Sequence, residues 1–230
     1  RPHVVAAKKR LTEGLDELRQ RHQSGCRGRE LCTAASALRD EVLRGLFDSA
    51  LAGFEAGEQD VLRRRVALVA HGGYGRRDVA PYSDVDLMIL RSEGARCVGP
   101  LVERLLCDVF DAGLDLGHSV RTPEEACRLA VEDATICTSL VESRLLTGSE
   151  ELFRSFFERF RQRVRRRASS LLAAMEKARV EERLKFGETV YLLEPNVKRS
   201  RGGLRDIHFL RWIGLARYGT PQPDELYALG

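Results

Sequence analysis

Two glycines and two aspartates, set between apolar runs, most constrain what this chain can fold into. One apolar run, at 66–70, is followed after His71 by Gly72 and Gly73. A second apolar run, made up of Val85 and residues 87–90, begins within the Asp-Val-Asp sequence of 84–86. Short apolar runs bounded by turn residues are typical of buried β-strands. The pattern predicts two core strands, with a glycine turn after the first and two carboxylates at the start of the second.

The two carboxylates predict a metal site. Asp84 and Asp86 are two residues apart, and in a strand such residues point to one face with α-carbons about 6.5–7 Å apart. Two anions this close repel unless a cation lies between them, and Mg²⁺ prefers such oxygen ligands. Two ions about 4 Å apart can hold the attacking and leaving oxygens of a nucleotidyl transfer. We therefore expect Asp84 and Asp86 to bind Mg²⁺, in a two-ion site.

The glycine turn predicts a phosphate site beside this metal site. Without side chains, Gly72 and Gly73 let backbone N–H groups approach a triphosphate, and Arg76 follows at a position where it can neutralise the charge. Each half alone has a simpler interpretation, because Asp-x-Asp is more often a solvated turn and Gly-Gly-x-Gly more often a tight turn. Together they favour a metal-nucleotide site.

The same residues carry a resemblance to a known family. Residues 72–87 read Gly-Gly-Tyr-Gly-Arg-Arg-Asp-Val-Ala-Pro-Tyr-Ser-Asp-Val-Asp-Leu, which resembles the signature of the DNA polymerase beta type nucleotidyltransferases and, more narrowly, of bacterial PII uridylyltransferases. Further segments support the narrower resemblance in the order usual for that family: Leu-Gly-His-Ser-Val-Arg-Thr at 116–122, Leu-Val-Glu-Ser-Arg-Leu at 140–145, Glu-Pro-Asn-Val-Lys at 194–198 and Gly-Gly-Leu-Arg-Asp-Ile at 202–207.

The sequence also departs from the family pattern. Arg77 and Asp78 stand where the family usually has Gly-Glu, so the turn there is less permissive, and residues 199–201 are more basic than usual. Family enzymes also contain a His-Asp phosphohydrolase domain and ACT sensing domains. No His-Asp dipeptide occurs in these 230 residues. We expect the nucleotidyltransferase portion only, and assign neither uridylyl removal nor glutamine sensing to the chain.

The resemblance implies an α+β fold in three parts. These are an N-terminal helical region at 1–60, a polymerase-beta-like core with a small mixed sheet at 61–148, and an associated helical region at 149–230, incomplete at its C-terminus.

The superfamily commonly takes a third carboxylate from a neighbouring strand. A strand predicted at 114–121 makes Asp115 the candidate by strand parity. Helical spacing predicts helices at 4–22, 30–56 and 98–112, helical stretches at 123–147 and 150–185 with a pause at 148–149 between them, and a helix at 204–215.

A second anion site is predicted near the C-terminus. A basic segment precedes Gly202, and a glycine loop that leads into a helix favours anions. A helix cap with exposed basic residues is the alternative. The resemblance favours nucleotide contacts by Lys198 and Arg205, with Asp206 as an orienting group, and implies a further contact by Ser83. The arginine-rich segment 159–167 is interpreted as a solvated helix face rather than as a docking surface for an acidic partner.

Composition excludes some classes of function. Hydrophobic residues make up 43% of the chain and the net charge is +4, which suits a globular nucleotide-binding protein and makes a nucleic-acid partner unlikely. No apolar run approaches the roughly 20 residues needed to cross a bilayer, so no membrane association is expected. The six cysteines lack metal-ligand spacing and predict reduced thiols in a cytoplasmic protein.

The resemblance implies a specific reaction, the magnesium-dependent transfer of UMP from UTP to a tyrosine hydroxyl of the signalling protein PII, with release of pyrophosphate. A protein adenylyltransferase of the same superfamily is one alternative. Another is a regulatory nucleotide-binding module that performs no transfer. A Rossmann dinucleotide site is less favoured, because residues 72–75 lack its full glycine spacing.

Overall fold

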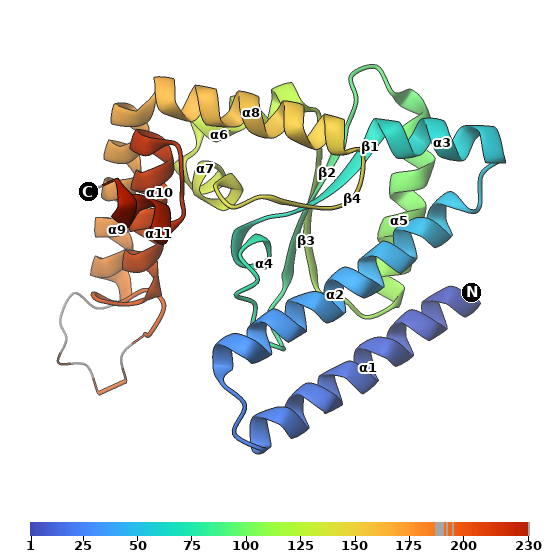
Figure 1. Cartoon of the computed structure of the whole chain (residues 1–230), viewed down its shortest axis with the longest axis horizontal. Helices are drawn as coiled ribbons and strands as arrows, with labels where there is room; N and C mark the ends of the chain where they lie inside the picture. The colour runs from blue at the N-terminus through green and yellow to red at the C-terminus, as the bar shows by residue number, and fades with distance from the viewer. Residues whose placement is uncertain (187–190, 192, 195, 230) are drawn as a thin grey trace. The chain divides into compact units, whose positions relative to one another are not determined.

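A computed structural model describes residues 1–186, 191, 193–194 and 196–229, except for the side chain of Arg96 (Figure 1). The chain is a mixed α+β protein with a small four-stranded sheet and flanking helices, which confirms the expected fold class. It divides into two compact units. The first comprises Arg1–Glu125 and Glu142–Phe156, and the second comprises Ala126–Val141 and Phe157–Gly230. In the part of the chain that the structure describes, no helix is both long and apolar enough to span a membrane.

The sheet lies in the first unit. Its strands are β1 (Val66–Ala70), β2 (Val85–Arg91), β3 (Leu116–Arg121) and β4 (Arg144–Gly148), in the order β3-β2-β1-β4. β1 pairs antiparallel with both β2 and β4, whereas β2 and β3 are parallel. The two strands expected from the apolar runs are confirmed. The third begins at Leu116, two residues later than expected.

Three long helices cover one face of the sheet (Figure 1). The helices and turns of this unit are α1 (Pro2–Gln23), α2 (Gly28–Leu51), α3 (Ala56–Arg65), α4 (Gly72–Gly75), η1 (Arg96–Val98), α5 (Gly99–Asp111) and the start of α6 (Pro123–Glu132). α1, α2 and α5 share a core with alternate residues of the central strands, namely Val66, Leu68, Ala70, Val85, Leu87 and Ile89. The intervening residues Ala67, Val69, Met88 and Leu90 are buried as well. Burial on both faces explains why β1 and residues 87–90 of β2 are unbroken apolar runs.

Residues 144–148 form an edge strand, so the expected helix over 123–147 is wrong at its C-terminal end. Pairing with β4 gives the second edge of β1 hydrogen-bond partners, which an exposed edge would lack. Gly148 permits this close pairing. Its φ is +95°, and a β-carbon there would lie 2.3 Å from the carbonyl oxygen of Val66.

Two other helix predictions need correction. The helix expected over 30–56 ends at Leu51, and α3 is a separate helix that begins with a reciprocal capping box between Glu55 and Glu58. The long helical stretch expected over 150–185 is divided at Arg167 into α8 (Glu150–Arg166) and α9 (Ala168–Phe186).

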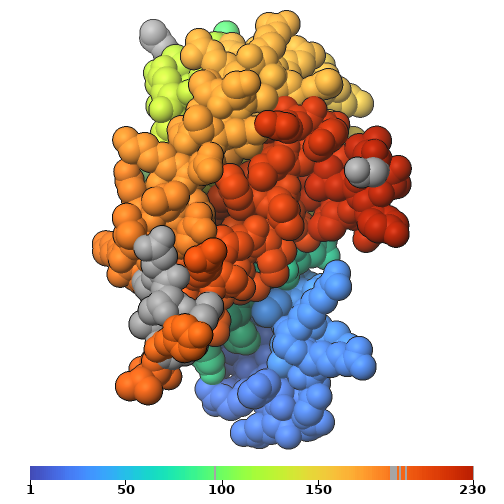
Figure 2. Space-filling model, turned by 90° about the vertical axis from the view of Figure 1, so that its left-hand side faces the viewer, coloured from blue at the N-terminus to red at the C-terminus, as the bar shows by residue number. Residues whose placement is uncertain are grey.

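The second unit is helical among its described residues. It contains most of α6 and of α8, together with α7 (Ala134–Leu140), α9, α10 (Leu204–Tyr218) and α11 (Pro223–Ala228). α9 and α10 lie side by side in Figures 1 and 2, with α11 next to α10. The loop that precedes α10 carries Lys198 and leads into Arg205.

Candidate nucleotide site

The glycine turn follows β1 directly. His71 is extended, with φ −139°, and Gly72 then turns with φ +58°. The N–H groups of Gly75 and Arg76 donate back to the carbonyl oxygens of His71 and Gly72, at 2.9 and 3.3 Å. The N–H groups of Gly72 and Gly73 lie at the start of the turn, and no hydrogen bond found within the described residues uses them. The turn therefore has two backbone donors to offer a ligand.

The three glycines of this turn have different tasks. Gly72 has a left-handed φ. Gly75 lies against the backbone, and a β-carbon there would approach the carbonyl oxygen of Glu142 to 2.3 Å. Gly73 has neither constraint, since its φ is not in the left-handed region and a β-carbon would meet nothing closer than Arg76 and Val79 at 3.8 Å. The fold itself does not require glycine at 73, whereas the close approach of a ligand would.

Arg77 stands in this turn where the family usually has glycine. Its φ is +62°, so an arginine adopts the left-handed conformation that glycine adopts most easily. The guanidinium lies 3.9 Å from a carboxylate oxygen of Asp40. The substitution therefore leaves the left-handed turn in place, and it strains the backbone at this residue.

The two aspartates lie at the start of β2, where the main chain of Asp86 adjoins the glycine turn. Asp84 immediately precedes β2 and is exposed, whereas Asp86 lies within β2 and is half-buried. One Asp86 carboxylate oxygen would lie 3.3 Å from a β-carbon placed on Gly117 of the neighbouring strand. The absent side chain at Gly117 thus leaves room for the Asp86 carboxylate. Hard carboxylate oxygens of this kind fit Mg²⁺, which proteins commonly hold by one or two carboxylates together with substrate phosphates.

Asp115 lies just outside the strand that was expected to carry it. Its carbonyl oxygen accepts a 2.9 Å hydrogen bond from the N–H of Val85. Its side chain lines a cavity of about 190 Å³ together with Ser83, Val85 and residues of α1 and α2. Among the described residues, no three acidic, histidine or cysteine side chains lie close enough together to hold a metal ion. The role of Asp115 as a third carboxylate and the contact by Ser83 remain predictions.

Arg76 is already paired with carboxylates. Its guanidinium donates to Asp78 at 3.1 Å and to Glu142 at 3.3 Å, and the side chain is only 8% exposed. A contact between Arg76 and a triphosphate remains a prediction. In this structure the side chain connects the glycine turn to the segment that precedes β4.

His71, which directly precedes the turn, is a partly buried titratable group. Burial, and to a smaller extent the positive charge of Arg121, lowers the pKa of His71 to about 4. The imidazole is therefore neutral at pH 7. Its backbone N–H donates a 3.1 Å hydrogen bond to the carbonyl oxygen of Asp86, so the turn and the second carboxylate are joined through the main chain.

Sequence reasoning did not single out two residues of α2 that contact this site. Arg39 binds carbonyl oxygens of the loop before Asp84, and Asp40 binds Tyr74 in the glycine turn. They lie within an amphipathic helix, in which charged residues are usually solvated. Only the tertiary fold shows that they are buried.

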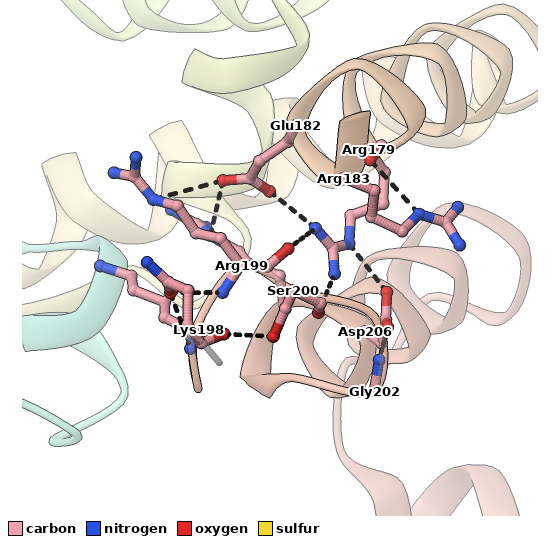
Figure 3. A network of polar contacts seen from close by, with 10 residues as sticks. Arg179, Glu182, Arg183, Lys198, Arg199, Ser200, Gly202 and Asp206 are labelled. Atoms are coloured by element: carbon pink, nitrogen blue, oxygen red, sulfur yellow. Dashed lines mark hydrogen bonds and ion pairs between the residues drawn. The ribbon is translucent and has the colours of Figure 1, made fainter. Parts of the chain in front are cut away.

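Lys198 and Arg205 belong to the second unit, so they are described apart from the residues above. Their loop is held by Arg179 of α9, which donates to the carboxylate of Asp206 at 2.8 Å and to the carbonyl oxygens of Arg199 and Ser200 at 2.7 and 2.9 Å (Figure 3). The Asp206 carboxylate also accepts the N–H of Gly202 at 2.7 Å (Figure 3). The hydrogen bond from Arg179, followed by that from Gly202, lowers the pKa of Asp206.

Lys198 and Arg205 differ in their surroundings. Lys198 is exposed, and its ammonium has no ion-pair partner within the described residues. Arg205 lies 4.0 Å from Glu182 and over the ring of Trp212, with its guanidinium carbon 5.9 Å from the ring centroid. Asp206 thus organises the loop itself, and contacts of Lys198 and Arg205 with a nucleotide remain predictions.

Comparison with known proteins agrees with the resemblance seen in the sequence. A family model described as GlnD PII-uridylyltransferase matches residues 158–230. Bifunctional uridylyltransferase/uridylyl-removing enzymes are similar over nearly the whole chain. The enzyme of Caulobacter vibrioides is 35% identical over 224 residues, or 96% of the chain, and that of Rhodopseudomonas palustris is 37% identical over 226 residues, or 97%. The enzyme of Phenylobacterium zucineum is 37% identical over 93% of the chain.

The chain spans about a quarter of the length of these relatives, 23–24% in each case. The expected resemblance to PII uridylyltransferases is confirmed, and with it a relationship to nucleotidyltransferase enzymes. The relatives' names describe activities of much longer proteins.

Proposed function

Since this chain is a relative of the PII uridylyltransferases, we propose that it is a magnesium-dependent nucleotidyltransferase that moves UMP from UTP to a tyrosine hydroxyl of PII and releases pyrophosphate. The observation that carries the proposal is that the glycine turn ends β1 beside the start of β2, where Asp84 and Asp86 lie. The pairing of Ala70 with Leu87 fixes this arrangement. The turn that we propose binds phosphate is thus next to the residues that we propose bind the metal.

The chain's own residues supply binding and orientation. The N–H groups of Gly72 and Gly73 would donate to phosphate oxygens, and Gly73 leaves room for them. Asp84 and Asp86 would hold Mg²⁺, which would neutralise the triphosphate and stabilise charge on the leaving pyrophosphate. Lys198 and Arg205 would contribute further positive charge. Holding the reactants in line supplies much of the acceleration expected of such a site.

The location follows from the proposed substrates. UTP and a nitrogen-signalling protein are found in the cytoplasm, and the six cysteines are free thiols, as is usual in a reducing compartment. A cytoplasmic protein is therefore part of the proposal.

Label transfer tests the proposal. The purified chain is incubated with Mg²⁺, PII and each of the four α-labelled ribonucleoside triphosphates in turn, and label on PII is measured. The proposal predicts label from UTP only, and none when the acceptor tyrosine of PII is replaced by phenylalanine. Label from ATP would instead support a protein adenylyltransferase. Nucleotide binding without transfer would support an inert module.

A further inference from the structure

Two successive residues of α2 are charged and yet buried. Arg39 is 5% exposed and Asp40 is 3% exposed. Burying a charge is costly unless the group is paired and hydrogen-bonded. Asp40 is paired with Arg144, and Arg39 is satisfied by hydrogen bonds to backbone carbonyl oxygens. Each residue binds a different part of the candidate nucleotide site.

Asp40 holds the glycine turn. The hydroxyl of Tyr74 donates a 2.6 Å hydrogen bond to the Asp40 carboxylate, and Arg144 of β4 donates to both carboxylate oxygens at 2.7 and 3.0 Å. Arg144 also donates to the carbonyl oxygen of Tyr74 at 3.4 Å and lies over its ring, 5.5 Å from the centroid. Tyr74 is fully buried, and burial followed by the charge of Asp40 raises its pKa well above the usual value. The hydroxyl therefore remains a donor at all physiological pH values.

Arg39 holds the loop before the carboxylates. One guanidinium nitrogen donates to the carbonyl oxygens of Pro81, Ser83 and Ala80, at 2.6, 3.2 and 3.4 Å. The other terminal nitrogen donates to the carbonyl oxygen of Ala35 on α2 itself, at 3.2 Å. Because Ser83 is bonded directly to Asp84, fixing the Ser83 carbonyl also fixes the backbone from which the first carboxylate projects.

One rigid element thus serves as a common reference for both parts of the site. The α-carbons of successive residues are 3.8 Å apart, and a helix holds their directions constant. Strand pairing fixes Asp86 relative to His71, but Asp84 lies outside β2 and the chain between the turn and Asp84 is a loop. Through Arg39 and Asp40, α2 connects the glycine turn at one end of this loop to the residues before Asp84 at the other end.

We propose that Arg39 and Asp40 are positioning residues that set the distance between the phosphate-binding glycine turn and the metal-binding carboxylates. Asp40 acts on nucleotide affinity through Tyr74, and Arg39 acts on metal affinity through Ser83 and Asp84. The predicted kinetic consequences depend on the proposed function, whereas the predicted structural consequences do not.

Hydrogen exchange of the whole chain tests the structural part. In Asp40→Asn, amide exchange should accelerate about tenfold in 72–77 and stay unchanged in 80–85, whereas Arg39→Met should do the reverse. Arg39→Lys keeps a cationic donor and should restore part of the protection. The matched control is Arg63→Gln, which removes a 2.7 Å ion pair between Arg63 of α3 and Asp48 of α2. It should change the exchange rate of neither segment. Equal acceleration of both segments by each variant, or of neither, would overturn the proposal.

Transfer kinetics test the functional part. Asp40→Asn should raise the KM for UTP about tenfold at saturating Mg²⁺, and Arg39→Met should raise the Mg²⁺ concentration for half-maximal rate by a similar factor. A purely structural role would lower the thermal midpoint and kcat and leave both of these concentrations unchanged, which contradicts the proposal. If the wild-type chain transfers no UMP, the proposed function fails, and the exchange data still decide whether Arg39 and Asp40 position the two segments.

Discussion

The backbone N–H of His71 and the carbonyl oxygen of Asp86 form a hydrogen bond of 3.1 Å. This bond lies one step beyond the last strand pair, Ala70 with Leu87, so it holds the residue before the glycine turn against the main chain of the residue that carries the second carboxylate. The candidate site therefore depends on strand register. A slip of one residue in β2 would turn Asp86 toward the core and expose an apolar neighbour.

The left-handed conformation of Arg77 gives a prediction about stability. Arg77→Gly and Arg77→Ala both remove the guanidinium, so they differ chiefly in backbone preference. The glycine variant should be more stable than the alanine variant by about 1 kcal/mol, because the left-handed strain outweighs the extra entropy of glycine in the unfolded chain. Urea unfolding of the two variants measures this difference. An alanine variant as stable as the glycine variant would contradict a φ of +62° at this residue.

The glycines of the turn should separate into structural and ligand-binding positions. Gly75→Ala places a β-carbon 2.3 Å from the Glu142 carbonyl oxygen, so it should destabilise the fold by about 2 kcal/mol or more. Gly73→Ala should change stability by less than about 0.5 kcal/mol and weaken UTP binding by about tenfold. Thermal unfolding and calorimetry check these effects. Unchanged UTP affinity in a folded Gly73→Ala variant would place the phosphate site elsewhere.

The sequence predicted those parts of the site that local pattern determines. The core strands are short apolar runs between turn residues, and the turn and carboxylates are marked by residue type, so these could be recognised. β4 could not, because residues 144–148 are too short and mixed to show a strand period, and pairing with β1 decides their conformation. Arg39 and Asp40 were missed for a similar reason, since only tertiary contacts show that they are buried.

His71 should make stability depend on pH. Its pKa of about 4 in the folded chain is below the usual 6.5, so the unfolded chain binds the proton more tightly. The resulting stability is complete above about pH 6.5 and is lost as the pH falls toward 4, by roughly 2–3 kcal/mol. Comparing the unfolding free energies of wild type and His71→Gln from pH 7 to 4 isolates this effect from that of the carboxylates. Parallel curves for the two proteins would show that His71 titrates normally.

The loop before α10 should contribute charge to nucleotide binding. Replacing Lys198 and Arg205 by alanine should weaken UTP binding, and raised salt should produce a related loss, because these attractions are screened over roughly 8–10 Å at physiological ionic strength. Replacing Arg165 and Arg166 of α8 by glutamine is the control and should leave UTP affinity unchanged. If only the control pair weakens binding, α8 rather than this loop contributes to the site.

The paired carboxylates are the centre of the account. Asp84→Asn and Asp86→Asn each replace a carboxylate with an amide of the same shape, at positions that are exposed or half-buried, so the fold should persist. Each should reduce UMP transfer by about a hundredfold or more, because a neutral amide is a poor ligand for Mg²⁺ and leaves the triphosphate charge uncompensated. Asp78→Asn, which alters a carboxylate paired with Arg76 in the same turn, is the control and should retain most of the activity.

The most direct measurement is the rate of UMP transfer from α-labelled UTP to PII by wild type, Asp84→Asn and Asp86→Asn, with circular dichroism spectra to verify folding. The account predicts Mg²⁺-dependent label on PII with wild type and near-background label with both variants, at unchanged thermal midpoints. Near-normal transfer by either folded variant would contradict the assignment of Asp84 and Asp86 as the metal-binding pair.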